Sequence, residues 1–443
     1  MKTSSDMAAP IVNICWLRRD LRLNDQAALY HALRSGMPVL PVFIFDTNIL
    51  DDLEDKADKR VLFIHHTLEQ LNKQLKNFGS TIVTFHGTPV EAFRYWTQKY
   101  QVGAVYTNHD YEPYARQRDA AVAKELELQG IGFFTSKDQV IFEKNEVLKD
   151  NGEPYTVFTP YSKKWRAKLT PFYLKSYPVD KYLSHLFKAK SEAIPSLASL
   201  GFKKLENAEF PSAELDEGII SDYKETRDFP YLTGTTRIGL HLRFGTVSIR
   251  EVARLGLELN DTFVNELIWR EFFQMILWHF PHVVGHSFKR EYDSIPWRNN
   301  EKEFRLWCEG KTGYPIVDAG MRELNATGFM HNRVRMITAS FLAKHLLIDW
   351  RWGEAYFAAK LLDYELASNN GNWQWAAGSG CDAAPYFRVF NPSLQTERFD
   401  KELIYIRKWV PELDTFDYPP QIIAHDIARK RALEVYSAAL KNK

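Results

Sequence analysis

Short apolar runs alternate with segments of helical periodicity over the first third of the chain. Segments with apolar residues at helical spacing lie between the runs, and two of these three segments end in glycine. The expected strands are 11–17, 38–45, 80–87 and 103–109, and the expected helices are 25–36, 59–79 and 89–100. Alternation of this kind predicts an α/β domain with a doubly wound parallel sheet over 11–135. No G-x-G-x-x-G follows the first run, so the dinucleotide fingerprint is absent there.

The rest of the chain changes character twice. Residues 136–205 are rich in turn formers, lysine and tyrosine, which predicts a long interdomain linker. From 206 to 443 helical periodicity dominates and strand signals vanish, which predicts a larger all-α domain. A chain of 443 residues is long for one domain, so this division also agrees with the length.

Composition narrows the classes of protein that remain. The net charge is +1, so contact with nucleic acid would need a local basic patch. Cys15, Cys308 and Cys381 are scattered, which argues for a reducing compartment, no disulfide framework and no metal site of the zinc type. The N-terminus is polar and is not a secretory signal. Nothing approaches the roughly 18 consecutive apolar residues of a membrane span. We therefore expect a cytoplasmic protein with no membrane contact.

One helical segment carries two different stripes. In "NELIWREFFQMILWHF" (265–280), one stripe is wholly apolar. Glu266, Trp269, Arg270 and Phe273 share another face. A carboxylate, an indole and a guanidinium on one face suit the wall of a pocket. A helix ion pair beside a half-buried Trp explains the spacing equally well.

Two further stretches have ligand-binding character. In "TGFMHNRVRM" (327–336), Gly328 is placed to end one helix, and a second begins near Asn332. Asn332, Arg335 and Met336 then share a face that suits a flat, partly apolar ligand, although Met on a helix is more often core. The loop "TGTTRIG" (233–239) offers backbone N–H groups, hydroxyls and an Arg to a phosphate, or is a plain turn with a solvated Arg.

The stretch "NNGNWQW" (369–375) contains two tryptophans separated by one residue. Residues two apart on a helix point about 200° away from each other. Trp373 and Trp375 therefore belong to opposite faces, and each needs its own role.

Four stretches together closely resemble the photolyase/cryptochrome flavoprotein family, and the resemblance runs from about residue 11 to the end. They are "WLRRDLRLND" (16–25), "WREFF" (269–273), "GKTGYPIVDAGMRELNATGFMHNRVRM" (310–336) and "NNGNWQWAAGSGCDAAPYFRVFNP" (369–392). The resemblance implies an N-terminal α/β antenna domain, a long linker and an all-helical catalytic domain that binds FAD in a bent shape. A monomer is usual in the family.

The resemblance also implies which residues hold FAD. They are Tyr223, Thr235, Thr236, Arg237, Asn332, Arg335, Asp363, Glu365 and Asn369. The chain departs from the family pattern at three positions. Gly239 stands where a serine is usual, Glu365 where an aspartate is common, and Phe329 where a tryptophan often lies. The first removes one hydrogen bond to phosphate.

The two tryptophans receive separate roles from the resemblance. Trp373, Trp350 and Trp297 match the chain of three that passes an electron from the surface to the flavin. Trp375 matches a residue that lines the substrate cavity on the other side. Indoles suit both roles, because they form a stable radical cation and offer a broad face for bases. The alternative for Trp297 and Trp350 is that they are large core residues.

The branch of the family depends on Asn332 and Met336. Six-four photolyases place histidines there as proton donors, whereas splitting a cyclobutane pyrimidine dimer needs an electron and no such acid. His331 lies one position off this face. Asn369 matches the position that faces flavin N5, where photolyases have Asn and plant-type cryptochromes have Asp. Glu266 and Trp269 match the residues that hydrogen-bond to the dimer and stack on it.

These residues predict light-driven repair of cyclobutane dimers in DNA, by an electron from photoexcited reduced FAD to a flipped-out dimer. The chain ends soon after the helical segments, without a long polar tail of the cryptochrome type. A six-four photolyase and a blue-light cryptochrome photoreceptor are the alternatives within the family. A light-independent electron carrier is the alternative outside it.

Two contacts are expected beyond the flavin. A basic rim for DNA phosphates would consist of Arg227, Arg270, Arg333 and Arg388, and the alternative for each is an internal salt bridge. Family members often carry an antenna chromophore, which is methenyltetrahydrofolate, a deazaflavin or a second flavin such as FMN. Asn108 and Glu112 lie near where some members bind it, and the sequence does not choose among these molecules.

Overall fold

The computed structural model describes residues 9–206 and 208–441. They form two compact units, each built from three separate stretches of chain. The first unit comprises residues up to Ile141, Thr170–Ala213 and Ile238–Arg254. The second comprises Phe142–Leu169, Glu214–Arg237 and the residues from Leu255 onward. The segment 136–205, expected as a linker, thus divides between the two units.

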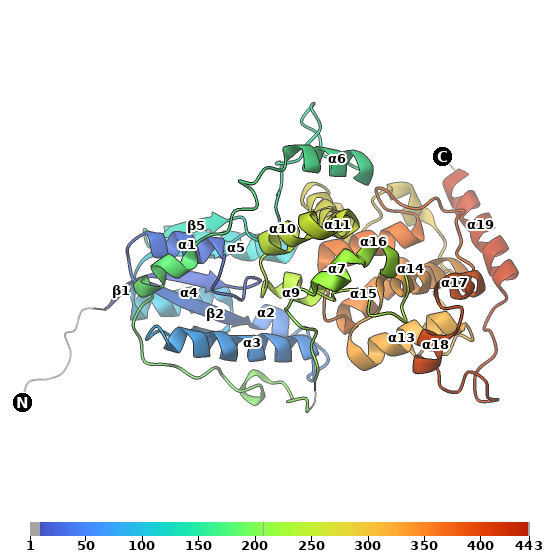
Figure 1. Ribbon diagram of the computed structural model, residues 1–443, viewed down its shortest axis with the longest axis horizontal. Coiled ribbons are helices and arrows are strands. Elements are labelled where there is room, and N and C mark those ends of the chain that lie inside the picture. Colours follow the sequence, from blue (N-terminus) through green and yellow to red (C-terminus); the bar gives the residue numbers. More distant parts are fainter. Residues whose placement is uncertain (1–8, 207, 442–443) are drawn as a thin grey trace, which may run out of the picture. The chain divides into compact units, whose positions relative to one another are not determined.

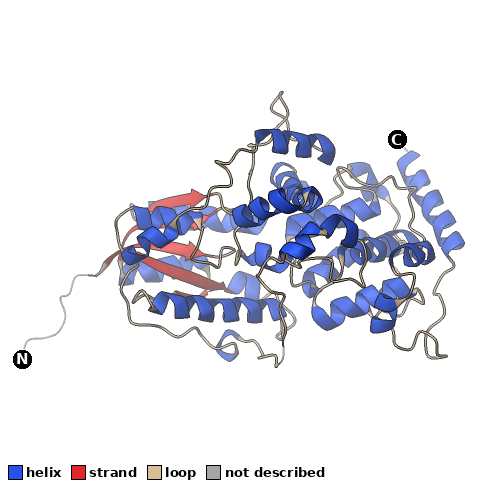
Figure 2. Ribbon diagram, in the orientation of Figure 1, coloured by secondary structure: helices blue, strands red, loops and turns tan. Residues whose placement is uncertain are grey.

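The first unit contains a five-stranded parallel sheet (Figures 1 and 2). Its strands are β1 (Ile11–Leu17), β2 (Val39–Asp46), β3 (Val83–Gly87), β4 (Gln101–Asn108) and β5 (Gly132–Ser136). The order is β3-β2-β1-β4-β5, so the direction of winding reverses at β1, as in doubly wound folds. The four expected strands and the α/β class are confirmed.

Helices connect these strands. They are α1 (Ala27–Arg34), the short α2 (Thr47–Leu50), α3 (Lys59–Lys76), α4 (Pro89–Lys99) and α5 (Pro113–Glu127). The three expected helices are confirmed, whereas β5 and α5 were not predicted. In β5 every residue is partly or fully exposed, and α5 buries only Ala115, Val122 and Leu126. Neither segment therefore has a strong apolar pattern.

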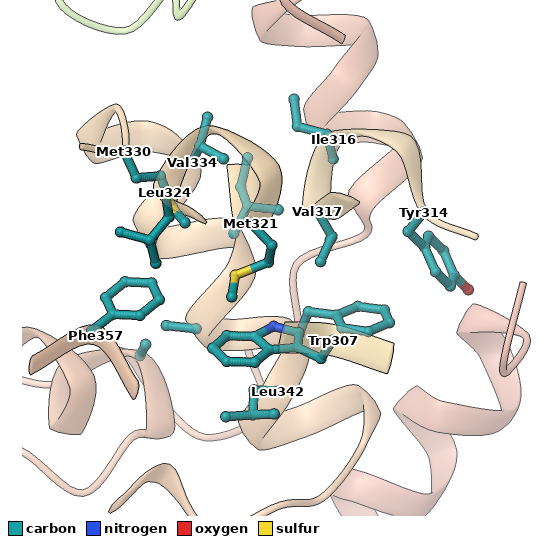
Figure 3. Packing of buried hydrophobic residues seen from close by; sticks show 14 of the residues in the cluster. Trp307, Tyr314, Ile316, Val317, Met321, Leu324, Met330, Val334, Leu342 and Phe357 are labelled. Atoms are coloured by element: carbon teal, nitrogen blue, oxygen red, sulfur yellow. The ribbon is translucent and has the colours of Figure 1, made fainter. Parts of the chain in front are cut away.

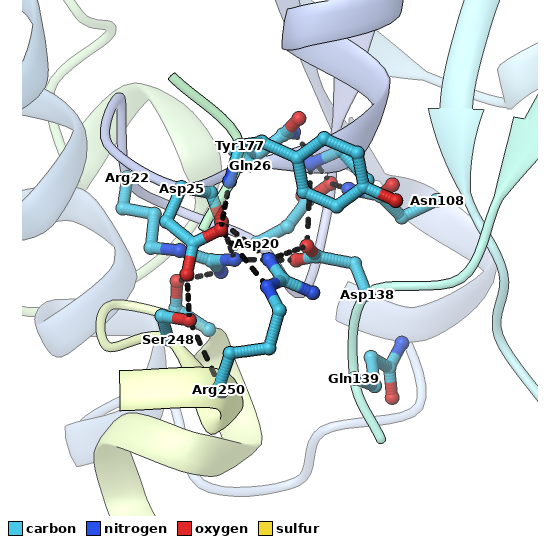
Figure 4. A network of polar contacts seen from close by, with 12 residues as sticks. Asp20, Arg22, Asp25, Gln26, Asn108, Asp138, Gln139, Tyr177, Ser248 and Arg250 are labelled. Carbon is cyan, nitrogen blue, oxygen red and sulfur yellow. Dashed lines mark hydrogen bonds and ion pairs between the residues drawn. The ribbon is translucent and has the colours of Figure 1, made fainter. Parts of the chain in front are cut away.

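A buried ionic network attaches later stretches of chain to the loop that follows β1 (Figure 4). Asp138 lies between two guanidiniums, with Arg22 Nη2 at 2.7 Å and Arg250 Nη2 at 2.8 Å. Arg250 Nε also donates to Asp25, at 2.9 Å. Burial alone would raise the pKa of Asp138, but Arg22 and Arg250 together lower it. These contacts explain why residues 238–254 belong to the α/β unit.

Helices make up the second unit. Its main helices are α6 (Phe158–Lys168), α8 (Tyr223–Thr226), α11 (Asp261–His279), α12 (Glu301–Cys308), α13 (Pro315–Thr327), α14 (Asn332–Ser340), α15 (Trp350–Lys360), α16 (Leu366–Ala377), α17 (Pro392–Phe399), α18 (Ile404–Trp409) and α19 (His425–Lys441). A π-helical turn, η5 (Phe341–His345), continues α14. All strands of the described residues lie in the other unit, so the expected all-α character of this part is confirmed.

The core of this unit surrounds Trp307, which Figure 3 shows between Met321 and Leu342. Trp350 and Trp373 belong to the same cluster, and Trp297 packs against it. Gly328 ends α13 with a φ of 77°, a backbone conformation that favours glycine, and α14 begins at Asn332 as expected. The packing of α12 to α16 around this core therefore supports the residues of the candidate site.

No helix in the described parts of the chain is both long and apolar enough to cross a bilayer.

Candidate functional site

A cavity lined by both polar and apolar side chains lies beside α14, α15 and α16 of the helical unit. Among the residues that line it are Asn332, Arg335, Met336, Asp363, Glu365, Asn369 and Trp373. The structure therefore brings together seven residues to which the resemblance gives a role. They come from α14, α16 and the turn before α16. The Leu362 N–H donates to the Gly328 carbonyl at 2.8 Å, which joins the start of that turn to the segment before α14.

Ion pairs organise the wall of this cavity. Arg335 Nη2 lies 2.8 Å from Asp363, and its Nε donates to the carbonyl of Met330 at 2.7 Å. Arg270 Nη2 lies 2.8 Å from Glu365, and both side chains are largely buried. Arg270 thus forms the internal salt bridge that was the alternative to a DNA contact.

Asn369 has a defined orientation in the cavity wall. Its side-chain nitrogen donates to Oε1 of Glu354 at 2.9 Å and to the Glu354 carbonyl at 3.1 Å. An amide nitrogen has two hydrogens, so both are used and the oxygen is the atom left to accept a bond from a ligand. Burial raises the pKa of Glu354, and the bond from Asn369 opposes that rise. Glu354 was not found from the sequence, since no motif links it to Asn369.

The loop 233–237 packs against α8. A Cβ on Gly234 would lie 2.7 Å from Cβ of Thr226, so only glycine fits this approach. Thr235 and Thr236 are half-buried, whereas Arg237 is exposed and has a φ of 52°. The Arg237 guanidinium lies 4.4 Å from the ring centre of Phe329, and that of Arg335 lies 5.6 Å from the same ring.

The residues that the sequence predicts to contact the lesion lie on α11, on α14 and, for Trp375, on α16. Glu266 forms an ion pair with Arg227, which follows α8. Burial raises the pKa of Glu266, and Arg227 lowers it in part. Tyr223, at the start of α8, lies under the same guanidinium, 5.8 Å from it.

Arg333 also pairs with a carboxylate. Its Nη2 lies 2.6 Å from Asp228, and its guanidinium lies 4.4 Å from the ring centre of Phe399. Nη1 approaches the sulfur of Met336 at 3.7 Å. Arg227 and Arg333 therefore both have acidic partners, and Asp228 is a further residue that the sequence analysis missed.

Arg388 differs from the other three arginines because it is exposed, next to Phe387, which is 62% exposed. Its backbone carbonyl accepts a bond of 2.8 Å from Nζ of the buried Lys344. Burial lowers the pKa of Lys344 to about 8, and Arg388 adds to the effect. A buried ammonium thus anchors the segment that carries an exposed aromatic ring and an exposed cation.

The two tryptophans of α16 lie on different sides of the helix, as the helical angle predicts. Trp373 is 2% exposed, whereas Trp375 is half-buried. Trp373 packs edge-on against Phe357, with ring centres 5.0 Å apart. A Cβ on Gly353 would lie 2.1 Å from Trp373, so α15 approaches this indole directly.

Trp350 begins α15 and is 1% exposed. The indole N–H groups of Trp350 and Trp373 are both buried and have no acceptor among the described residues. Trp297 is half-buried and meets Tyr436 edge-on, with ring centres 5.9 Å apart.

In the α/β unit, Asn108 and Glu112 have protein partners. Asn108 donates to Asp20 at 2.6 Å and accepts from the Ala28 N–H at 3.0 Å. Glu112 accepts from Arg19 at 3.0 Å and from Arg243 at 2.8 Å. Their assignment to an antenna site stays a prediction.

Comparisons with known proteins agree with this arrangement. Residues 13–180 match the family model described as DNA photolyase, and residues 263–417 match the FAD binding domain of DNA photolyase. A relative from Synechococcus, named deoxyribodipyrimidine photo-lyase, is 37% identical over 97% of each chain. A crystal structure of a bacterial class III photolyase from Agrobacterium tumefaciens matches with a TM-score of 0.87, at 33% identity over all of both chains. An archaeal photolyase from Sulfolobus tokodaii matches with a TM-score of 0.83, at 35% identity over 96% of this chain and all of that one.

A parallel α/β unit and a helical unit with the family's FAD-binding domain define a flavoprotein of the light-dependent type. The chain belongs to the photolyase/cryptochrome family.

Proposed function

We propose that this protein is an enzyme that repairs cyclobutane pyrimidine dimers in DNA with blue light. Relatives from Synechococcus, Halobacterium salinarum and Escherichia coli are named deoxyribodipyrimidine photo-lyase, at 35–37% identity over 97% of this chain. The observation that carries the proposal is that Asn332 and Met336 line the same cavity as Asn369. An amide and a thioether provide no acid near neutral pH, so the site suits electron transfer without proton donation.

His331 does not replace the missing acid. Its Nδ1 accepts a bond from the backbone N–H of Arg333 at 3.2 Å, as the N-cap of α14. The side chain is 4% exposed, and burial, followed by Arg335, lowers its pKa to about 4. The ring is therefore neutral near pH 7 and has one nitrogen occupied by the cap.

FAD is the cofactor, and when it is bound in reduced form and excited by light it supplies the electron that opens the cyclobutane ring and then takes that electron back. The described residues fit it, because the cavity offers the free oxygen of Asn369 and the ordered Arg335–Asp363 pair. We assign FAD binding to the cavity wall that carries Asn369 and the Arg335–Asp363 pair, together with the loop before α9 (Gly239–Phe244). The residues are Tyr223, Thr235, Thr236, Arg237, Asn332, Arg335, Asp363, Glu365 and Asn369.

In this proposal Glu354 holds the amide of Asn369 so that its oxygen points to the cofactor. Glu266 and Trp269 contact the dimer, and Trp375, on the other side of α16 from Trp373, lines the space that receives the dimer. Trp373, Trp350 and Trp297 pass an electron inward from the surface. The indole N–H groups of Trp350 and Trp373 have no acceptor among the described residues, which supports this role. An indole that has lost an electron there keeps its proton, so the positive charge moves on to the half-buried Trp297.

DNA is the proposed partner. Arg388 is the exposed cation of the rim, and Arg227 and Arg333 would exchange their carboxylate partners for phosphates when DNA binds. Extrusion of the dimer costs less than extrusion of normal bases, because damaged bases pair and stack poorly. We propose that the chain works as a monomer in the cytoplasm, where Cys15, Cys308 and Cys381 remain free thiols.

A repair assay tests the function directly. Oligonucleotides that carry a cyclobutane dimer or a six-four photoproduct are illuminated with blue light in the presence of FAD-loaded protein. We expect loss of the cyclobutane dimer only. Intact cyclobutane dimers would contradict the proposal, and loss of the six-four product would move the chain to the other branch. The absorption spectrum of the same sample reports any antenna chromophore.

A further inference from the structure

The rings of Phe158 and Trp269 form a nearly parallel stack. Their centres lie 3.7 Å apart, and their planes differ by 3°. Because carbon atoms in contact lie about 3.5 Å apart, the sideways offset of the two rings is only on the order of 1 Å. The phenyl ring therefore covers one face of the indole. The Phe273 ring also packs on this indole, with ring centres 5.5 Å apart and planes inclined by 29°, so aromatic rings of α6 and α11 together restrict the plane of the indole.

The position of Phe158 is imposed by the backbone of α6. Phe158 is the first residue of this helix, and its N–H donates to Oδ2 of Asp382 at 3.0 Å. Val157, the N-cap residue, contributes no side-chain bond. The Asp382 carboxylate thus caps α6 from a distant part of the chain, where the helix dipole favours a negative charge.

The other end of α6 is attached to α11 itself. Trp165 Nε1 donates to Oε2 of Glu271 at 2.6 Å, and the Phe142 N–H donates to the same oxygen at 3.1 Å. Glu271 is 2% exposed and lies two residues after Trp269 on α11. Phe272, which follows Glu271, meets Phe158 edge-on with ring centres 5.9 Å apart. The stack is therefore held by two fixed helices.

We propose that Phe158 is a positioning residue for lesion recognition, which fixes the plane of the Trp269 indole before an extruded pyrimidine pair arrives. This inference rests on the proposed role of Trp269 in stacking on the dimer. A side chain that is ordered in advance loses less entropy on binding, so more of the stacking free energy remains as affinity. The benefit applies to an extruded base and not to undamaged duplex or to FAD.

Three substitutions test the proposal in full-length, FAD-loaded protein. Phe158→Leu keeps an apolar side chain but removes the flat ring, and Phe158→Tyr keeps the ring. Phe172→Ala removes a Phe that is 77% exposed and serves as the matched control. We expect the Phe158→Leu variant to show a Kd and a KM for dimer-containing DNA raised roughly 5- to 10-fold. The kcat, the Kd for undamaged DNA and the FAD content stay within about twofold, as expected for a loss confined to one stacking contact of this size.

The Phe158→Tyr variant and the control should behave like the unchanged protein. Asp382→Ala, which loosens the stack from the capped end of α6, should lower dimer affinity in the same direction by a smaller factor. Unchanged dimer affinity in Phe158→Leu would overturn the inference. An equal loss of affinity for undamaged DNA, or loss of FAD, would also overturn it, because that result shows a general structural role.

Trp269→Ala separates this inference from the function on which it rests. If the unchanged protein has no preference for dimer-containing DNA, the proposed function fails. If it has that preference, and Trp269→Ala loses it while Phe158→Leu does not, only the role of Phe158 fails.

Discussion

Glu354 holds both hydrogens of the Asn369 amide, through its carboxylate at 2.9 Å and its carbonyl at 3.1 Å. The pair joins α15 to α16 at the cavity wall, and it leaves the Asn369 oxygen as the acceptor. A glutamine at position 354 can donate a hydrogen bond as well as accept one. Replacement of the carboxylate would therefore allow the Asn369 amide to flip by 180° and exchange its oxygen and nitrogen.

We therefore expect Glu354→Gln to retain FAD but to shift its two-electron reduction potential by on the order of 30 mV, which corresponds to about one hydrogen bond. Spectroelectrochemistry of the purified protein measures this shift. Glu309→Gln changes an exposed carboxylate and is the control. An unchanged potential would show that Glu354 does not control the orientation of the amide.

Glu266→Ala should weaken binding of dimer-containing DNA by roughly tenfold, because a hydrogen bond to a charged, partly buried group is lost. The repair yield should fall as well. FAD should stay bound, since Glu266 forms its ion pair with Arg227 and does not line the flavin cavity. Binding titrations and repair yields measure the two effects. Glu225→Ala, which removes an exposed carboxylate on α8, is the control. Unchanged repair in the Glu266 variant would remove this residue from the site.

The elements with strong periodicity could be predicted from the sequence. Four strands and the break at Gly328 follow from local patterns, and the separation of Trp373 from Trp375 follows from the helical angle alone. The strand β5 could not be predicted, because "GFFTS" is short and partly exposed along its whole length. Local pattern therefore fails where an element is stabilised mainly by its neighbour in the sheet.

The site divides in a similar way. Residues within long motifs were found from the sequence, and the cavity collects seven of the residues that the resemblance named. Their partners were not found, since these lie far away along the chain or outside any motif. Asp228 is 105 positions from Arg333, and Glu354 carries no motif of its own. Pairing across such distances depends on the packing of helices, which periodicity does not specify.

Trp350→Phe should slow photoreduction of the flavin by at least tenfold, because phenylalanine is much harder to oxidise than an indole and breaks the relay between Trp373 and Trp297. Trp297→Phe should have the same effect. Both variants should repair dimers normally when the flavin is first reduced chemically. Trp352→Phe, on the same helix but about 200° away, is the control. Loss of repair under reducing conditions would contradict a relay role and favour a core role.

The α/β unit should depend strongly on its buried network. Arg250→Met removes one of the two cations beside Asp138 and leaves a carboxylate without full compensation. Such a change costs about 3–5 kcal/mol, whereas surface ion pairs contribute less than about 1 kcal/mol. We expect a lower urea midpoint for the variant, measured by circular dichroism. Lys164→Met, which breaks an exposed pair with Asp150, should leave the midpoint unchanged. Equal midpoints for the two variants would show that the network is dispensable.

Acid should unfold the helical unit through two buried histidines. Burial, with nearby cations, lowers the pKa of His331 to about 4 and burial, with His425, lowers that of His345 to about 3. Between pH 6.5 and these values the unfolded chain binds more protons than the folded chain, so stability falls as the pH is lowered. At about 1.4 kcal/mol per pKa unit, complete protonation costs on the order of 3 kcal/mol at His331 and on the order of 5 kcal/mol at His345.

His331→Asn removes one of the two titrations and keeps a good N-cap for α14. The free energy of unfolding, measured by urea titration from pH 7 to pH 4, should therefore fall less steeply in this variant. His86→Asn changes an exposed histidine and is the control. Parallel curves for the His331 variant and the unchanged protein would show that folding does not lower the pKa of His331. That result would contradict the conclusion that burial keeps this ring neutral.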